Sequence, residues 1–278
     1  MEKHLKIKKK NKIFFQKNLL SYLQKLKITD GDTLFIHSDI SILKRFGNNL
    51  DLREMLEVLI LSLSKILGKK GTLVFPAYYY EVQKKKYFDL NSSISKELGI
   101  LPIYVNSLKN SYRSINPITS VVAIGFNAKK ICNPRFSSSY GVNSPFDVLT
   151  KLKSKMMFFG TDLSVMTYVH FVEFLLAVPH RYNKYINLKI KDKNKKVSKK
   201  KITIYVRYNK LNVINDPQGN LKKFKNLKSL IIKKIGIKKS YILNFKDIFT
   251  YLEHNISKNP FYLLKEIPKF SIKNYPLI

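Results

Sequence analysis

Apolar and polar positions along the first part of the chain follow the alternation of helices and buried strands. Apolar residues recur every three to four positions over 14–26, which predicts a helix. A turn at Gly31 precedes a short apolar strand predicted at 33–37, and a helix is predicted at 50–67. The segment 71–76, "GTLVFP", predicts a second buried strand that ends at its proline. The order strand, helix, strand indicates a βαβ unit with a parallel strand pair.

The rest of the chain continues this pattern and then changes. We predict strands at 120–125 and 155–160 and a helix at 164–178. Beyond residue 185 the segments 186–190 and 201–208 alternate like antiparallel strands around a charged turn. The segments 230–235 and 247–256 are predicted to be helical. The pattern favours an α/β protein with an antiparallel C-terminal extension.

The chain shows no internal repeat and no linker rich in Gly, Ser or Pro. We therefore expect a basic N-terminal tail at 1–12 and a single domain at 13–278, a size that one α/β unit reaches. The tail lacks the apolar stretch of a secretory signal, and no run of about 18 apolar residues occurs. These features predict a soluble, cytoplasmic protein without a membrane span.

Composition changes this picture in two respects. Cys132 is the only cysteine, so an intrachain disulfide and a cysteine-based zinc site are excluded. The formal net charge is +34, which is typical of proteins that bind nucleic acids or anionic membranes. However, the basic residues are 46 lysines and only six arginines, whereas proteins that read sequence or clamp phosphates favour arginine. Lys, Asn and Ile share A/T-rich codons, so genome composition also explains the charge, and we expect no specific nucleic-acid partner.

Candidate chemistry centres on His170. The chain has no Gly-rich dinucleotide loop, phosphate loop, His-Glu-x-x-His helix or Gly-x-Ser-x-Gly elbow. His170 and Glu173 are three residues apart in the predicted helix, so the carboxylate can orient the imidazole and raise its basicity. Thr167 falls on the same side and offers a hydroxyl to a developing oxyanion. The alternative interpretation is a core histidine paired with a buried glutamate for structural reasons.

A second polar group follows the first predicted strand. His37, Ser38 and Asp39 stand where open α/β sheets place their ligands, at the carboxyl end of a strand. Backbone amides and the hydroxyls of Ser38 and Ser41 could hold phosphates there. A helix N-cap is the alternative interpretation of the same residues.

Five segments in this order resemble a known family. They are "GDTLFIHSDIS" at 31–41, "GTLVFP" at 71–76, "RSINPITSVVAIG" at 113–125, "NSPFDVL" at 143–149 and "FFGTDLSVMTYVHFVEFLLAVPHRY" at 158–182. Together they resemble the aminoglycoside 3-N-acetyltransferases, the antibiotic N-acetyltransferase family. The resemblance implies a three-layer α/β/α fold around a mixed β-sheet and acetyl transfer from acetyl-CoA to an amine, without a metal.

The resemblance also implies roles for individual residues. His170 matches the base that deprotonates the substrate ammonium, Glu173 its orienting partner and Thr167 a stabiliser of the thioester oxygen. Coenzyme-binding positions match at the following residues: His37, Ser38, Ser41, Arg113, Ser114 and Ser120.

The chain departs from the family pattern at Asn116, where aminoglycoside-modifying members carry histidine before the proline. We expect this position, with Tyr78 and Tyr79 from an aromatic run, to contact the substrate, because aromatic faces suit a sugar ring.

The net charge then decides the expected substrate. An enzyme that binds polycationic aminoglycosides needs an acidic cavity, which a chain of +34 makes unexpected. We therefore expect an N-acetyltransferase acting on an amino sugar in surface-polysaccharide biosynthesis, and a homodimer is possible. The alternatives are an aminoglycoside 3-N-acetyltransferase that confers antibiotic resistance and a basic nucleic-acid-binding protein without catalysis.

Overall fold

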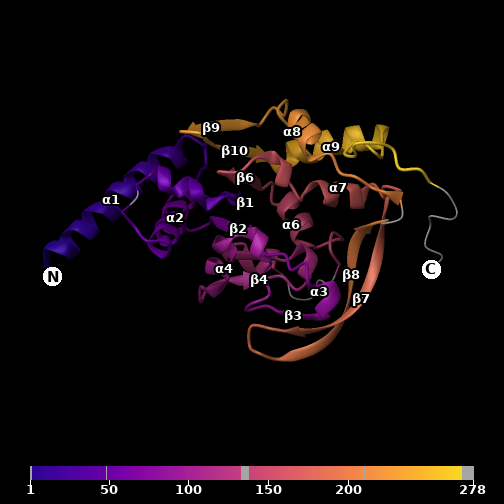
Figure 1. Cartoon of the computed structure of the whole chain (residues 1–278), viewed down its shortest axis with the longest axis horizontal. Helices are drawn as coiled ribbons and strands as arrows, with labels where there is room; N and C mark the ends of the chain where they lie inside the picture. The colour runs from indigo at the N-terminus through magenta and orange to yellow at the C-terminus, as the bar shows by residue number, and fades with distance from the viewer. Residues whose placement is uncertain (1, 48, 133–137, 209–210, 271–278) are drawn as a thin grey trace.

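A seven-stranded mixed sheet forms the centre of the protein. The structure is a computed structural model that describes residues 2–47, 49–132, 138–208 and 211–270. The strands of this sheet are β1 (Thr33–Ser38), β2 (Thr72–Pro76), β4 (Tyr112–Arg113), β5 (Val121–Gly125), β6 (Lys155–Phe159), β9 (Ile231–Ile235) and β10 (Lys238–Asn244). They lie in the order β4-β5-β2-β1-β6-β10-β9 (Figure 1).

The parallel part of the sheet lies at its middle. Strand β1 runs parallel to both β2 and β6, while every other pairing in this sheet is antiparallel. Helix α2 (Leu52–Leu67) connects β1 to β2, so the predicted βαβ unit is confirmed. Asp51 and Glu54 form a reciprocal capping box at the start of this helix, which fixes where it begins.

Alternating side chains of the strands point into two separate hydrophobic layers. On β1, Leu34 and Ile36 join one cluster and Phe35 joins the other. The first cluster is covered by α1 (Glu2–Gln24), α2 and α4 (Ile100–Ser107). The second is covered by α5 (Ala128–Ile131), α6 (Pro145–Lys151), α7 (Val169–Leu175), α8 (Pro217–Phe224) and α9 (Phe245–Lys258). The predicted α/β/α arrangement around a mixed sheet is therefore confirmed.

A second, three-stranded sheet extends from this core. It consists of β3 (Tyr87–Asp89), β7 (Arg181–Lys191) and β8 (Val197–Arg207) in the order β3-β7-β8, and helix α3 (Val82–Lys85) precedes β3. Strands β7 and β8 form a long antiparallel hairpin that curves along one side of the molecule to reach β3 (Figure 1). Its buried face packs Leu188, Ile190 and Ile202 against Phe88. This hairpin is the predicted antiparallel extension, and each strand is longer than its pattern indicated.

Four short 3-10 helices complete the described fold: η1 (Ile40–Arg45), η2 (Lys96–Leu98), η3 (Pro117–Thr119) and η4 (Leu163–Val165). Within the residues that the structure describes, no helix is both long and apolar enough to cross a membrane.

The helix predicted at 230–235 is wrong. These residues form the edge strand β9, joined to β10 by a tight turn in which Gly236 adopts a φ of 57°. A short apolar run does not distinguish a helix from a strand, and glycine in this conformation permits the hairpin.

Two other boundaries also differ from the predictions. Residues 2–12, expected as a tail, belong to α1, whose Lys12 pairs with Glu57 of α2 at 3.1 Å. The helix predicted at 164–178 is split into η4 and the shorter α7. Met166 causes the break because its extended backbone, with ψ of 102°, cannot continue a helix.

Candidate active site

A cavity of about 510 Å³ opens where β1, β2 and β6 end. It is lined from β1 by His37 and Ser38, from the segment after β2 by Tyr78 and Tyr80, and by other residues that include Thr161, Thr167 and His170. The cavity thus lies at the carboxyl ends of the parallel strands, where open α/β sheets place their ligands.

The loops after β1 and β6 pack tightly against each other beside this cavity. The amide of Asp39 donates to the carbonyl of Phe159 at 2.9 Å. Gly160 has a φ of 78°, and a Cβ at this position would stand 2.5 Å from the carbonyl oxygen of Asp39. Glycine is therefore required here, because any side chain would force the two loops that frame the cavity apart.

His170 and Glu173 lie on adjacent turns of α7, as their spacing predicts. His170 Nδ1 is 2.6 Å from Glu173 Oε2, and the imidazole keeps 26% of its side-chain surface exposed while the carboxylate is buried. A hydrogen bond from Nδ1–H to the carboxylate leaves Nε2 of His170 unprotonated and able to accept a proton.

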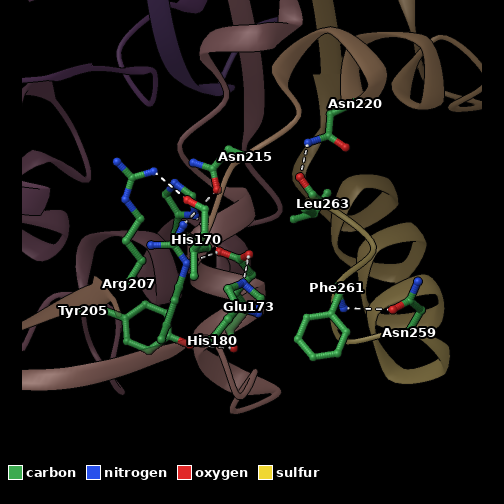
Figure 2. A network of polar contacts seen from close by, with 12 residues as sticks. His170, Glu173, His180, Tyr205, Arg207, Asn215, Asn220, Asn259, Phe261 and Leu263 are labelled. Carbon is green, nitrogen blue, oxygen red and sulfur yellow. Dashed lines mark hydrogen bonds and ion pairs between the residues drawn. The ribbon is translucent and has the colours of Figure 1, made fainter. Parts of the chain in front are cut away.

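Two further residues hold the carboxylate, and the sequence did not single them out. His180 Nε2 is 3.1 Å from Glu173 Oε1, and Arg181 Nε is 2.9 Å from Oε2. Figure 2 shows Glu173 between the two imidazoles, with the hydroxyl of Tyr205 reaching its backbone carbonyl. The only signal in the sequence was the position of His180 and Arg181 at the end of the last segment that carries the resemblance.

The charges of this cluster set the protonation of its members. Burial opposes the ionisation of Glu173, but the charge of Arg181 and the two imidazole hydrogen bonds outweigh it and hold the pKa of Glu173 well below its usual range. Burial, followed by the positive charge of Arg181, lowers the pKa of His170. Glu173 is therefore an ionised acceptor, and His170 is a neutral base at physiological pH.

Thr167 precedes α7 instead of sharing its face with His170. Its Oγ1 lies 2.6 Å from the hydroxyl of Tyr78, and both residues line the cavity. Burial raises the pKa of Tyr78 well above its ordinary value, so this hydroxyl stays protonated and can donate to Thr167. The hydroxyl hydrogen of Thr167 is then free to point toward a ligand.

The charged side chains of the cavity lining contradict the expectation from net charge. Asp39 and Glu97 are its carboxylates, and no lysine or arginine lines it among the described residues. Lys238 lies beside the lining, with its Nζ 2.6 Å from Asp39 Oδ2, and offsets the charge of Asp39. The lining itself thus carries acidic and no basic side chains among the described residues, within a chain of +34.

The predicted coenzyme residues are only partly brought together. His37 and Ser38 line the cavity, and burial lowers the pKa of His37 to about 3, so its ring is neutral. Ser41 lies outside the lining, and its backbone amide donates to Asp39, which caps η1. The alternative interpretation of this segment as a helix cap therefore also describes part of the geometry.

Arg113, Ser114 and Ser120, which the resemblance places at the coenzyme, do not line this cavity. Arg113 donates to Ser120 and to the carbonyls of Leu90, Ala77 and Ser93. Ser114 and Ser120 bond the neighbouring backbone. All three side chains are buried, and their hydrogen bonds hold the loops beside β5.

Two predicted substrate residues are also displaced from the cavity. The Tyr79 ring stacks on Phe88 of the second sheet. Asn116 is buried and donates to the carbonyl of Thr203 at 2.8 Å. Successive residues of an extended segment point to opposite sides, so Tyr78 and Tyr80 line the cavity while Tyr79 faces away.

Comparisons with known proteins identify the family of the chain. The family model described as aminoglycoside 3-N-acetyltransferase matches residues 35–257. The chain belongs to this family. The aminoglycoside N(3)-acetyltransferase III of Salmonella sp is 24% identical over 184 residues, which are 60% of this chain and 62% of that protein. The chain thus matches less than two thirds of the length of this curated relative.

Solved structures of similar fold include two complexes. One is described as AAC-IIIb binary with CoASH, with a TM-score of 0.73, 21% identity and coverage of 91% of this chain and 98% of that one. The other is AAC-VIa bound to sisomicin, with a TM-score of 0.71, 16% identity and coverage of 86% and 96%. At these identities the likeness establishes the fold of this aminoglycoside 3-N-acetyltransferase family member.

The prediction of an amino-sugar acetyltransferase in surface-polysaccharide biosynthesis is wrong. The matching family model is that of the aminoglycoside 3-N-acetyltransferases, which was the alternative. The physical error was to assign the net charge of the whole chain to its cavity. The lining of that cavity carries two carboxylates and, among the described residues, no lysine or arginine.

Proposed function

We propose that this protein transfers the acetyl group of acetyl-CoA to the 3-amino group of an aminoglycoside. The observation that carries the proposal is a cavity in which a histidine base, His170, is accompanied by the carboxylates of Asp39 and Glu97. A negative lining attracts a polycationic substrate, and like-charge repulsion would exclude it from a cavity lined by lysines. Membership of the family supports the same reaction.

His170 acts as the general base in this proposal. A protonated amine has no lone pair with which to attack a thioester, so its proton must leave first. Nε2 of His170 accepts this proton, while Glu173 holds Nδ1 and stabilises the imidazolium that forms. The amine nitrogen then forms a bond to the thioester carbon and the carbon–sulfur bond breaks. The second proton lost by the nitrogen passes to the thiolate, so coenzyme A leaves as the thiol, and the imidazolium of His170 releases its proton to solvent.

Thr167 stabilises the negative charge on the thioester oxygen. In this proposal the hydroxyl of Tyr78, 2.6 Å away, is the donor to Thr167 Oγ1, which leaves the hydroxyl hydrogen of Thr167 for the reacting carbonyl. Tyr78 is buried, so its hydroxyl is already in place beside Thr167 before the substrate arrives. Tyr78 is thus a positioning residue in the proposal instead of a direct contact to the sugar.

The acyl donor occupies the side of the cavity formed by the end of β1. Ser38 offers a hydroxyl to the donor there, and Lys238, which pairs with Asp39 of this wall, supplies a positive charge for its phosphates. Neutral His37 adds no charge at this wall. The solved neighbour with CoASH supports a coenzyme A donor for this fold.

The test measures release of free thiol from acetyl-CoA, corrected for hydrolysis, with sisomicin and with glucosamine as acceptors. Sisomicin is chosen because a structural neighbour binds it, and glucosamine because it carries a single amine. We expect thiol release with sisomicin at a far lower KM than with glucosamine, and increased drug tolerance in cells that express the protein. Binding of acetyl-CoA without thiol release across a panel of aminoglycosides would overturn the proposal.

A further inference from the structure

A second hollow lies on the three-stranded sheet, apart from the cavity at His170. It has a volume of about 750 Å³ and shares no residue with the lining of that cavity. Strands β7 and β8 and the start of β3 form it, and we call it the lysine groove. Six lysines line it: Lys85, Lys86, Lys189, Lys199, Lys200 and Lys201. No aspartate or glutamate is part of its lining among the described residues.

Two of these lysines face each other directly across the hairpin. Lys189 of β7 is the cross-strand partner of Lys199 of β8, and both are exposed. Like charges in this arrangement are destabilising. Lys191, two residues further along β7, differs because its charge is paired with Asp89 at 3.1 Å. The groove is therefore a place where the sheet concentrates positive charge at a cost to its own stability.

The other strand of the sheet adds to this concentration. The amide of Lys189 donates to the carbonyl of Lys86 at 3.0 Å, which brings the α3–β3 segment alongside β7. Lys85 makes an ion pair with Glu81 at 2.6 Å, but both side chains are more than half exposed. Such a pair is weak and readily exchanged for another anion.

Exposed aromatic rings accompany the lysines. Tyr185 is 63% exposed, and the ammonium of Lys201 lies 4.6 Å from the centre of its ring. Tyr87 lines the groove and is 37% exposed. A positively charged groove beside exposed tyrosines is the combination that binds single strands, in which lysines follow the phosphates and bases stack on the rings.

We propose that the lysine groove binds single-stranded nucleic acid without sequence preference. Lysine contacts phosphates as a point charge, and no arginine lines the groove to read base edges among the described residues. Stacking on tyrosine tolerates every base. Bases on Tyr185 distinguish this ligand from a bare phosphate chain, which has nothing to stack.

The experiment measures fluorescence anisotropy of a labelled twelve-nucleotide oligo(U) RNA over a range of salt concentrations. The double variant Lys189→Gln/Lys199→Gln removes the facing lysines. The matched control is Lys69→Gln/Lys70→Gln, which removes the same charge from two exposed residues in the turn between α2 and β2. We expect the groove variant to weaken binding at least tenfold and to make the salt slope shallower by about 1.4, at about 0.7 per lost phosphate contact.

A third variant tests whether the groove prefers nucleic acid to a polyanion without bases. Tyr185→Leu is expected to lower the affinity for oligo(U) about tenfold and to leave the affinity for inorganic polyphosphate within twofold. Equal losses in the groove variant and the matched control would show an effect of net charge alone and overturn the groove. Equal losses of oligo(U) and polyphosphate in Tyr185→Leu, or no loss of either, would overturn the nucleic-acid assignment.

Discussion

The cavity at His170 and the lysine groove have opposite charges on one polypeptide. The cavity is lined by two carboxylates and no lysine or arginine among the described residues, whereas six lysines line the groove. Both belong to a chain with a net charge of +34. Net charge describes the average field at a distance, and a ligand in a cavity experiences the few side chains that the fold brings to that surface.

The two regions also differ in how their charges are held. Glu173 is buried and fixed by His170, His180 and Arg181, so its interactions are little screened by salt. The lysines that face each other in the groove, Lys189 and Lys199, are exposed and will be screened strongly. Salt and pH therefore act on different regions, which makes the comparison testable.

The largest expected effect comes from His170→Ala. Loss of the proposed general base should reduce kcat for acetyl transfer about 100- to 10,000-fold. Circular dichroism should remain that of the wild type, and oligo(U) binding in the groove should not change. Turnover at the wild-type rate would exclude His170 as the base, and a parallel loss of RNA binding would contradict the independence of the two regions.

Arg181→Gln tests how far the charge of Arg181 adds to burial in lowering the pKa of His170. Without Arg181 the carboxylate of Glu173 is less opposed and raises the pKa of His170, so the acid limb of kcat/KM should move to higher pH. Removal of one partner from a buried pair also costs about 3–5 kcal/mol of stability.

Arg181→Lys is the matched control because it retains the charge and loses the fixed geometry. Its acid limb should stay near that of the wild type even where its rate falls. A uniform loss of rate with unmoved limbs in both variants would reduce Arg181 to a structural role.

His37 gives the next largest effect, on stability against pH. Its pKa is about 3 in the folded protein and close to 6.5 in the unfolded chain. Below pH 6.5 the unfolded chain binds a proton that the folded protein does not, so stability falls as the pH drops toward 3. At pH 5 this amounts to about 2 kcal/mol, from about 1.4 kcal/mol for each pH unit.

His37→Gln removes this titration. Urea unfolding at pH 7 and pH 5 should therefore show a smaller loss of stability in the variant than in the wild type, by about 2 kcal/mol. An identical loss in the two proteins would place the acid sensitivity elsewhere.

Glu97→Gln tests whether the acidic lining of the cavity contributes to binding of the cationic substrate. Loss of one exposed carboxylate from the cavity lining should raise the KM for sisomicin about two- to fivefold, since exposed charge pairs contribute up to about 1 kcal/mol. The effect should shrink with added salt. Glu253→Gln removes an exposed carboxylate on α9, outside the lining, and should leave the KM unchanged.

The smallest effect concerns the groove without any ligand. Lys189→Gln/Lys199→Gln removes a like-charge cross-strand pair and should raise the free energy of unfolding by about 0.2–1 kcal/mol. Lys69→Gln/Lys70→Gln has no such pair to relieve and should leave it nearly unchanged. A lower urea midpoint for the groove variant would show that the facing lysines do not repel.

Local patterns predicted the parts of the protein that depend on neighbours in sequence. The βαβ unit, the hairpin and the pairing of His170 with Glu173 each follow from periodicity or from a spacing of three residues. The strand at 231–235 was misjudged because five residues carry too little periodicity to separate a strand from a helix.

Contacts between distant segments were beyond the sequence. Tyr78 meets Thr167 across 89 residues, and nothing near either residue indicates the other. The resemblance placed Arg113 at the coenzyme, but the structure buries its side chain, which lowers its pKa to about 9, and loop carbonyls occupy its donors. The charge of the cavity likewise depends on which few side chains of a lysine-rich chain are directed into it.

The late position of β10 in the chain has a consequence for how the protein is made. Strand β10, at 238–244, pairs with β6, at 155–159, and carries β9 at the edge of the sheet. During synthesis, the edge of β6 that β10 will cover therefore stays unpaired until some eighty further residues have been added. An open edge templates pairing with other chains. Truncation before β10 should accordingly yield aggregates, and full-length chains should depend on chaperones until the sheet closes.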